Sequence, residues 1–253
     1  MRAGPSAEAE LTTQALHGQT LAVYEERDGF AHARMAFDGY VGWVALDKLA
    51  PPASGPVRRV KALRSFAFSR PDLKSKPLKS MSLNSLVVHG QAEGRFVACE
   101  TGGWMVADHL AAPDKVEDDP AAVALRFRGA PYLWGGKESL GLDCTGLTQM
   151  AFAACGVTLP RDSDMQFAWA GAEIGDWDRP GALQRSDIVF WKGHCGIMLD
   201  SETLLHANAH HMACEMEPLA GAIERIEVLY GRPIGARRID VAADRGRRPV
   251  WLA

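Results

Sequence analysis

The sequence lacks an apolar leader and any long basic run, and each absence excludes a class of protein. The first residues, MRAGPSAEAE, have no apolar stretch behind their arginine, so they form neither a signal peptide nor a membrane anchor. The formal net charge is -3, and the absence of a basic run gives nucleic-acid binding little support. We therefore expect a soluble, cytoplasmic protein with neither a membrane nor a nucleic acid as partner, unless a leader has been removed.

Cysteine is scarce and lacks the spacings of disulfide or metal sites. The five cysteines form no CxxC pair, which favours reduced thiols over a disulfide framework. The segment HANAHHMACE offers zinc ligand types in His206, His210, His211 and Cys214. It has no HExxH or CxxC spacing, however, and we expect no metal and no cofactor.

Two stretches in the first half share an order of features. Residues 21–52 and 86–113 each begin with a short apolar strand, pass an acid-Gly turn and end in Gly-Trp, an apolar run, Asp and Leu. Short strands broken by glycine turns are typical of a small β-barrel, and the pattern resembles bacterial SH3-like modules. The plainer alternative is two β-rich segments with one core tryptophan each. We predict module 1 at residues 12–52 and module 2 at residues 57–112.

A polar, acidic segment at residues 113–122 separates these modules from a third region. We predict a catalytic domain at residues 119–242 and leave the tail at residues 243–253 unassigned. The 47% content of hydrophobic residues is enough to build a core in each part.

One cysteine of this region stands at the start of a predicted helix. After Asp143, the apolar residues follow the spacing of an amphipathic helix, and Gly156 supplies its stop. Cys144 then lies in the first turn, where free N–H groups and the helix dipole favour a thiolate. The glycines upstream allow a substrate or another backbone to approach the sulfur. This position suits an activated nucleophile, although a small buried cysteine at the start of a core helix has the same pattern.

Two histidines on predicted neighbouring strands provide a base. Residues 187–191 read as a strand, Lys192 and Gly193 as a tight turn, and residues 194–199 as the returning strand that begins with His194. The next strand carries His206. Cross-strand neighbours can hydrogen-bond, so one imidazole can take the thiol proton while the other fixes its orientation.

The stretches PYLWGGKESLGLDCTGLTQMAF, SDIVFWKGHCGIMLD and LLHANA together resemble the NlpC family of papain-like cell-wall cysteine peptidases. The resemblance covers about residues 122–240 and implies an α+β fold, with a helix packed on an antiparallel sheet behind two SH3-like β-barrels. It implies that Cys144 is the nucleophile, His194 the general base and His206 its orienter. It also implies an oxyanion site formed by the Cys144 N–H and the Tyr132 hydroxyl.

Two residues depart from the usual family pattern. Thr145 follows the cysteine where serine is usual, and it keeps the hydroxyl. Cys195 follows His194 where valine is usual. Because neighbouring side chains on a strand point to opposite faces, we expect Cys195 to be a core residue.

Further residues are predicted to bind substrate. Arg161 offers a planar fork for carboxylates, and Asp162 and Ser163 are short polar groups that could also cap the following helix. Asp143 and Thr145 are expected to meet the ammonium of a substrate, because a cation removed from water needs a partner.

The family branch with two such modules implies hydrolysis of the γ-D-glutamyl–diamino acid bond in peptidoglycan-derived peptides with a free N-terminal L-Ala. We expect one module to close one end of the cleft. The alternatives are an amidase or acyltransferase that uses the same Cys-His pair, and a non-catalytic wall-binding protein.

Overall fold

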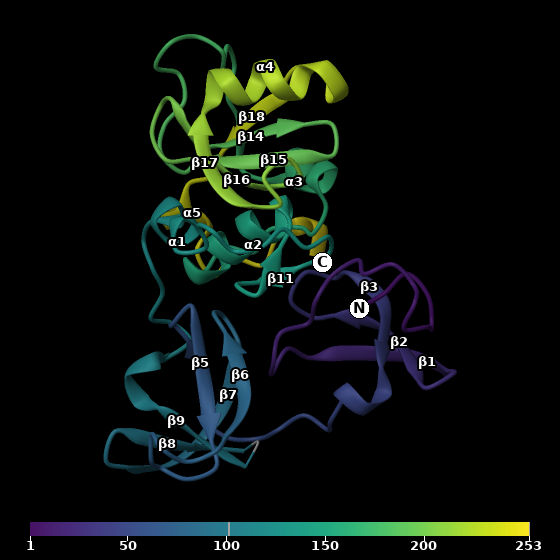
Figure 1. Ribbon diagram of the computed structural model, residues 1–253, viewed down its shortest axis with the longest axis vertical. Coiled ribbons are helices and arrows are strands. Elements are labelled where there is room, and N and C mark those ends of the chain that lie inside the picture. The colour runs from purple at the N-terminus through teal and green to yellow at the C-terminus, as the bar shows by residue number, and fades with distance from the viewer. Residues whose placement is uncertain (101, 253) are drawn as a thin grey trace. The chain divides into compact units, whose positions relative to one another are not determined.

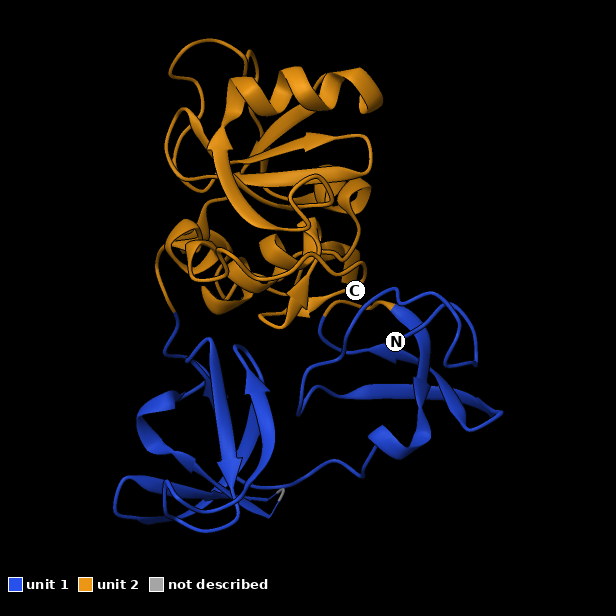
Figure 2. Cartoon of the chain, viewed as in Figure 1, with its two compact units in different colours: residues 1–37, 41–116 blue, residues 38–40, 117–253 orange. Residues whose placement is uncertain are grey.

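The structure is a computed structural model that describes residues 1–100 and 102–252. It divides into two compact units (Figure 2). Unit 1 comprises Met1–Phe37 and Val41–Val116, and unit 2 comprises Asp38–Tyr40 and Glu117–Ala253. Asp38–Tyr40 therefore belong with the second half of the chain, although they connect two strands of the first.

Unit 1 begins with a three-stranded antiparallel sheet in the order β1-β2-β3. In β2 the side chains alternate between buried and half-buried positions, as expected for a sheet with one face on a core. Arg2 pairs with Trp43, so residues before position 12, the predicted start of module 1, are also part of this module. Its elements are β1 (Leu21–Arg27), β2 (Phe30–Met35), β3 (Val41–Ala45) and the 3-10 turn η1 (Leu46–Lys48).

The remainder of unit 1 is a seven-stranded sheet in the order β10-β4-β7-β8-β9-β5-β6. A cluster of buried apolar residues that includes Met81, Val87 and Met105 forms its core. Its elements are β4 (Val57–Val60), β5 (Arg64–Phe68), β6 (Pro77–Ser82), β7 (Leu86–Glu93), β8 (Phe96–Cys99), β9 (Gly103–Val106), η2 (Ala107–His109) and β10 (Leu110–Ala111).

Unit 2 combines helices with a six-stranded antiparallel sheet in the order β13-β18-β14-β15-β16-β17, which confirms the α+β prediction (Figure 1). Its strands are β11 (Lys137–Glu138), β12 (Gly141–Leu142), β13 (Ala172–Glu173), β14 (Ile188–Trp191), β15 (His194–Met198), β16 (Thr203–Asn208), β17 (Ala213–Pro218) and β18 (Gly235–Arg238). Its helices are α1 (Pro120–Leu125), α2 (Cys144–Ala154), α3 (Ser163–Trp169), α4 (Leu219–Tyr230), α5 (Val241–Asp244) and η3 (Val250–Leu252).

The central strands of this sheet are covered by helices and are buried except at their first residues, His194 of β15 and Thr203 of β16. Helix α2 packs against β15 and β16, and α4 packs against β16 and β17. A cluster that includes Val189, Trp191, Leu204 and Ile226 joins the sheet to α4. This packing fixes the two strands that carry His194 and His206.

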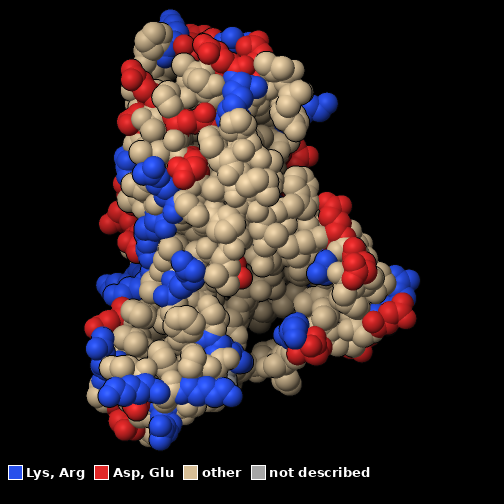
Figure 3. Space-filling model, viewed as in Figure 1, with Lys and Arg blue, Asp and Glu red and all other residues tan. Residues whose placement is uncertain are grey.

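The predicted tail continues the second unit. Arg245 bonds the Cys155 carbonyl oxygen, and the Gly246 N–H donates to the Gly156 carbonyl oxygen at 2.9 Å, so the tail lies against the end of α2. Of the residues described, no helix combines the length and apolar character needed to cross a bilayer. Acidic and basic side chains both lie on the visible face of each unit, between areas of uncharged residues (Figure 3).

Candidate active site

The nucleophile candidate lies where the sequence pattern predicted it. Cys144 is the first residue of α2, and the Asp143 side chain caps this helix by accepting the Gly146 N–H at 2.8 Å. A Cβ at Gly146 would lie 2.1 Å from the Gly136 carbonyl oxygen, so the turn at Gly136 and the first turn of α2 approach closely only because glycine is present. This close contact places the glycine-rich segment beside the sulfur.

The predicted histidine pair also meets. The strands β14 and β15 form the expected hairpin, in which Trp191 is opposite His194. The His194 Nε2 lies 2.8 Å from the His206 Nδ1. His206 is fully buried, and this burial lowers its pKa although Glu217 acts in the other direction. The second histidine is therefore neutral near pH 7 and can orient the first.

The electrostatics of Cys144 favour the thiolate. Its pKa lies well below the ordinary value because a hydrogen bond from Cys195, together with the charge and hydrogen bond of His194, outweighs burial. Burial, and then the neighbouring Cys144, raise the pKa of Cys195 well above its ordinary value. Cys195 is buried, as predicted, but it also contacts the nucleophile, which the strand pattern did not indicate.

Tyr132, the predicted second oxyanion donor, lies on the segment before the glycines. Its N–H donates to the Met212 carbonyl oxygen at 2.9 Å. Burial and then the negative charge of Cys144 raise its pKa, so the hydroxyl keeps its proton and can donate a hydrogen bond.

Asp143 and Arg161 form a buried pair beside the nucleophile. The Arg161 guanidinium, 2% exposed, donates to both carboxylate oxygens of Asp143, at 3.0 and 2.5 Å. The same carboxylate accepts the Gly135 and Gly146 N–H groups and the Thr145 hydroxyl. A carboxylate offers about four acceptor positions, so these bonds occupy the Asp143 carboxylate. They give Asp143, Thr145 and Arg161 a positioning role, and the predicted substrate contact of these three residues stays a prediction.

Asp162 and Ser163 lie at the start of α3. Asp162 occupies the N-cap position, but its side chain makes no capping bond. Its carboxylate instead faces the Tyr40 hydroxyl, with the two oxygens 3.5 Å apart. Burial, and then the charge of Asp162, raise the pKa of Tyr40 to about 12. Ser163 is half-buried in the first turn, and the predicted substrate contact of both residues stays a prediction.

Sequence reasoning missed the acidic partner of His206. The His206 Nε2 lies 2.7 Å from Oε1 of Glu217 on β17, and Arg225 on α4 donates to the same oxygen. These residues could not be paired from the sequence, because the ladder places Glu215 directly opposite His206.

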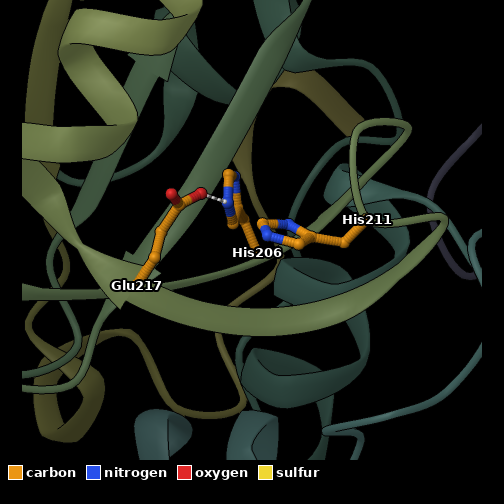
Figure 4. A group of neighbouring side chains, drawn as sticks. All are labelled: His206, His211 and Glu217. Carbon is orange, nitrogen blue, oxygen red and sulfur yellow. Dashed lines mark hydrogen bonds and ion pairs between the residues drawn. The ribbon is translucent and has the colours of Figure 1, made fainter.

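The surroundings of His206 also contain side chains of the types that bind metal ions. His206, His211 and Glu217 bring potential ligand atoms within 4.8 Å of one another, with the two rings and the carboxylate side by side (Figure 4). Both nitrogens of His206 are already engaged, and the Arg225 cation contacts the carboxylate oxygen that a metal would need. The geometry favours a hydrogen-bonded chain over a cation site.

Two family models match the chain. Residues 129–225 match the NlpC/P60 family, and residues 1–49 match the bacterial dipeptidyl-peptidase Sh3 domain. Dipeptidyl-peptidase 6 of Lysinibacillus sphaericus is 33% identical over 103 residues, which are 41% of this chain and 36% of that protein. The chain thus spans about a third of that relative.

Two further similarities extend over most of the chain. Gamma-D-glutamyl-L-lysine dipeptidyl-peptidase of Bacillus cereus is 24% identical over 244 residues, which cover 83% of this chain and 71% of that protein. The crystal structure of an NlpC/P60 family protein from Bacillus cereus superposes with a TM-score of 0.73 at 23% identity, covering 90% of this chain and 81% of that one. The structural likeness establishes the papain-like fold of unit 2.

Proposed function

Since the chain carries an NlpC/P60 domain behind a bacterial SH3 domain, we propose that it is a cysteine peptidase that hydrolyses peptidoglycan-derived peptides. One observation carries the proposal. The Cys144 thiol lies at the start of a helix, and its pKa is lowered in part by His194. The Nε2 of His194 lies in turn 2.8 Å from the Nδ1 of His206. Cys144 acts as nucleophile, His194 as general base and His206 as its positioning residue.

The reaction follows from these positions. The Cys144 thiolate attacks the carbonyl carbon, and the C–N bond breaks as His194 gives its proton to the leaving amine. Water then attacks the thioester, returns a proton to His194 and releases the acid and the thiolate. The Cys144 N–H and the Tyr132 hydroxyl stabilise the oxyanion, and a donor of this kind is worth about 3 kcal/mol.

The proposed bond is the one between γ-D-glutamate and a diamino acid, in a peptide with a free N-terminal L-Ala. Relatives named for gamma-D-glutamyl-L-lysine dipeptidyl-peptidase activity support this choice. Asp162 is the carboxylate proposed to bind this ammonium. Burial disfavours its charged form and so raises its pKa, and a bound cation would offset this destabilisation. We propose short soluble peptides in the cytoplasm, as released during cell-wall recycling, as the substrates, because the mechanism requires a reduced thiol.

The test is mass spectrometry of the products from L-Ala-γ-D-Glu-L-Lys, its diaminopimelate analogue and their N-acetylated forms, with the Cys144→Ala variant as the inactive control. Release of L-Ala-γ-D-Glu and the free diamino acid is expected, with the acetylated peptides cut far more slowly. Cleavage at another bond would favour the amidase or acyltransferase alternative, and binding to sacculi without products would favour the wall-binding one. Faster release from sacculi than from soluble peptides would overturn the recycling assignment.

The Asp162→Asn variant tests the ammonium contact. This variant is expected to cleave the free peptide more slowly, so that the ratio of kcat/KM for the free peptide to kcat/KM for the acetylated peptide becomes smaller. An unchanged ratio would exclude Asp162 from this role.

A further inference from the structure

A chain of hydrogen bonds extends from the proposed base across the sheet to α4. The His194 Nε2 is 2.8 Å from the His206 Nδ1, and the His206 Nε2 is 2.7 Å from Glu217. Arg225 holds the same Glu217 oxygen from the other side. Figure 4 shows the Glu217 carboxylate directed at the edge of the His206 ring.

The protonation states of Glu217 and His206 determine which atom donates in each hydrogen bond of this chain. Burial alone would raise the pKa of Glu217, but the hydrogen bond and charge of His206, and then the charge of Arg225, lower it to about 2. The ordinary pKa of 4.5 already lies well below neutral pH. Glu217 is then a carboxylate at neutral pH and can only accept. Buried His206, whose own pKa is lowered by burial, is neutral and has a single ring proton. That proton must lie on Nε2.

The consequence reaches the base. With its proton on Nε2, His206 presents a lone pair at Nδ1, so the contact of 2.8 Å requires His194 to donate from its Nε2. Neutral His194 therefore holds its proton on Nε2 and keeps Nδ1 open. A base must present a free nitrogen to the thiol, and Nδ1 is the nitrogen left for Cys144.

We propose that Glu217 is a positioning residue that sets the tautomers of both histidines and stabilises the His194 imidazolium during turnover, with Arg225 keeping its carboxylate in place. The proposal rests on the proposed function, because it assigns His194 as the base. A negative charge two hydrogen bonds away favours the protonated form of His194 in the thiolate–imidazolium pair.

Several other charged or titratable groups face this chain of hydrogen bonds. The effect of Glu217 on the pH dependence of activity must be distinguished from the effects of these groups. Cys144 on α2 faces His194, while Arg225 on α4 and His211 after β16 lie near His206 and Glu217. The His211 Nδ1 is 3.0 Å from the Asn208 side-chain oxygen. None of these groups is a second carboxylate, so Glu217 is the negatively charged group that bonds His206 among the residues described.

The first experiment needs no activity. Nitrogen-15 NMR of the Cys144→Ala variant, labelled at histidine, reports which ring nitrogen carries the proton near neutral pH, and a His206→Gln version assigns the signals. The expected result is the Nε2–H tautomer for both His194 and His206. An Nδ1–H tautomer at His206 would overturn the proposal whether or not the protein cleaves peptides.

The second experiment compares two isosteric changes on one strand. Glu217→Gln is expected to lower kcat/KM about tenfold to a hundredfold, as for the carboxylate partners of metal-binding histidines, which likewise fix a tautomer and a ring orientation. KM should change little, and the alkaline limb of the pH profile should move to lower pH. Glu215→Gln is the matched control, because Glu215 lies opposite His206 in the ladder but bonds Arg128.

The outcomes separate this proposal from a structural role. Equal losses in both variants, or a loss in Glu217→Gln with an unmoved pH profile, would contradict the tautomer role. Thermal unfolding of both variants identifies any loss that follows from misfolding. If the unaltered enzyme cuts none of the peptides, the proposed function fails while the NMR result still decides the role of Glu217.

Discussion

On each side of the nucleophile a carboxylate is paired with an arginine, but the two pairs hold different parts of the site. On the helix side, Asp143 is paired with Arg161, and on the strand side Glu217 is paired with Arg225. The helix-side pair is nearly inaccessible, with side chains 9% and 2% exposed, and the strand-side pair is 17% and 28% exposed.

The difference lies in what each carboxylate holds. Asp143 bonds the backbone of two turns and the Thr145 hydroxyl, so it fixes the shape of the helix start. Glu217 bonds an imidazole that bonds a second imidazole beside the sulfur. We expect changes on the helix side to reduce stability and changes on the strand side to reduce rate.

The largest effect is expected from the base itself. His194→Ala should lower kcat/KM by about 10²–10⁴-fold, the usual contribution of a positioned proton-transfer group. His206→Ala should lower it less, since it removes orientation but not the base. Steady-state kinetics on the tripeptide, with folding checked by circular dichroism, give both values. A larger loss in His206→Ala would mean that the two roles are exchanged.

Stability should respond most at a further buried pair, Asp38 and Lys137, whose carboxylate also bonds Gln149 of α2. The Lys137 Nζ, fully buried, lies 3.3 Å from Oδ2 of Asp38, which also accepts the Gln149 amide at 2.9 Å. Asp38→Ala removes the carboxylate from a buried cation, and this should cost about 3–5 kcal/mol of unfolding free energy. Urea unfolding measures the loss.

Two further variants sharpen that result. The double change Asp38→Ala with Lys137→Met should recover much of the stability, because neither charge is then buried. Asp47→Ala is the surface control, since its pair with Lys48 is 69% and 72% exposed, and its effect should stay within about 0.5 kcal/mol. A double variant as unstable as the single one would show that the carboxylate itself, and not its pairing with the buried Lys137, matters.

The features predictable from the sequence are those set by neighbouring residues. The start of α2 at Cys144 follows from local spacing and capping, and the β14–β15 hairpin follows from its apolar strands and Lys192-Gly193 turn. The meeting of His194 and His206 followed from the order of those strands. Each needed contacts only along one segment or between consecutive strands.

The features that were missed depend on distant pairings. Asp38 and Lys137 are separated by 99 positions, and no local pattern joins them. The sequence predicts that Arg161 binds a carboxylate, and no local pattern indicates that Asp143 of this chain provides one. Glu217 reaches His206 diagonally across the ladder, so strand register alone would have selected Glu215.

A smaller effect on stability is expected at acid pH. Because the pKa of Glu217 is lowered from 4.5 to about 2, its contribution to stability is present above about pH 4.5 and is lost as the pH falls toward 2. The unfolding free-energy difference between the unaltered protein and Glu217→Gln should therefore shrink by about 1–2 kcal/mol between pH 6 and pH 2, after allowance for solvent screening. Urea unfolding across that range measures it. A constant difference would mean that Glu217 has no charge-dependent partner.

The smallest effect concerns the contact between the two cysteines. The hydrogen bond from Cys195 is the leading cause of the low pKa of Cys144, and valine cannot donate it. Cys195→Val should therefore raise the pKa of Cys144 and slow its alkylation by iodoacetamide about fivefold at a pH below that pKa, which corresponds to a hydrogen bond of about 1 kcal/mol. Alkylation at high pH should be unchanged, because the thiolate is then fully formed in both proteins. Cys195→Ser is the matched control, since its hydroxyl can still donate and should preserve most of the rate. If valine and serine slow alkylation equally, packing around Cys195 sets the reactivity, and His194 on the strand side then controls the thiolate without help from the neighbouring thiol.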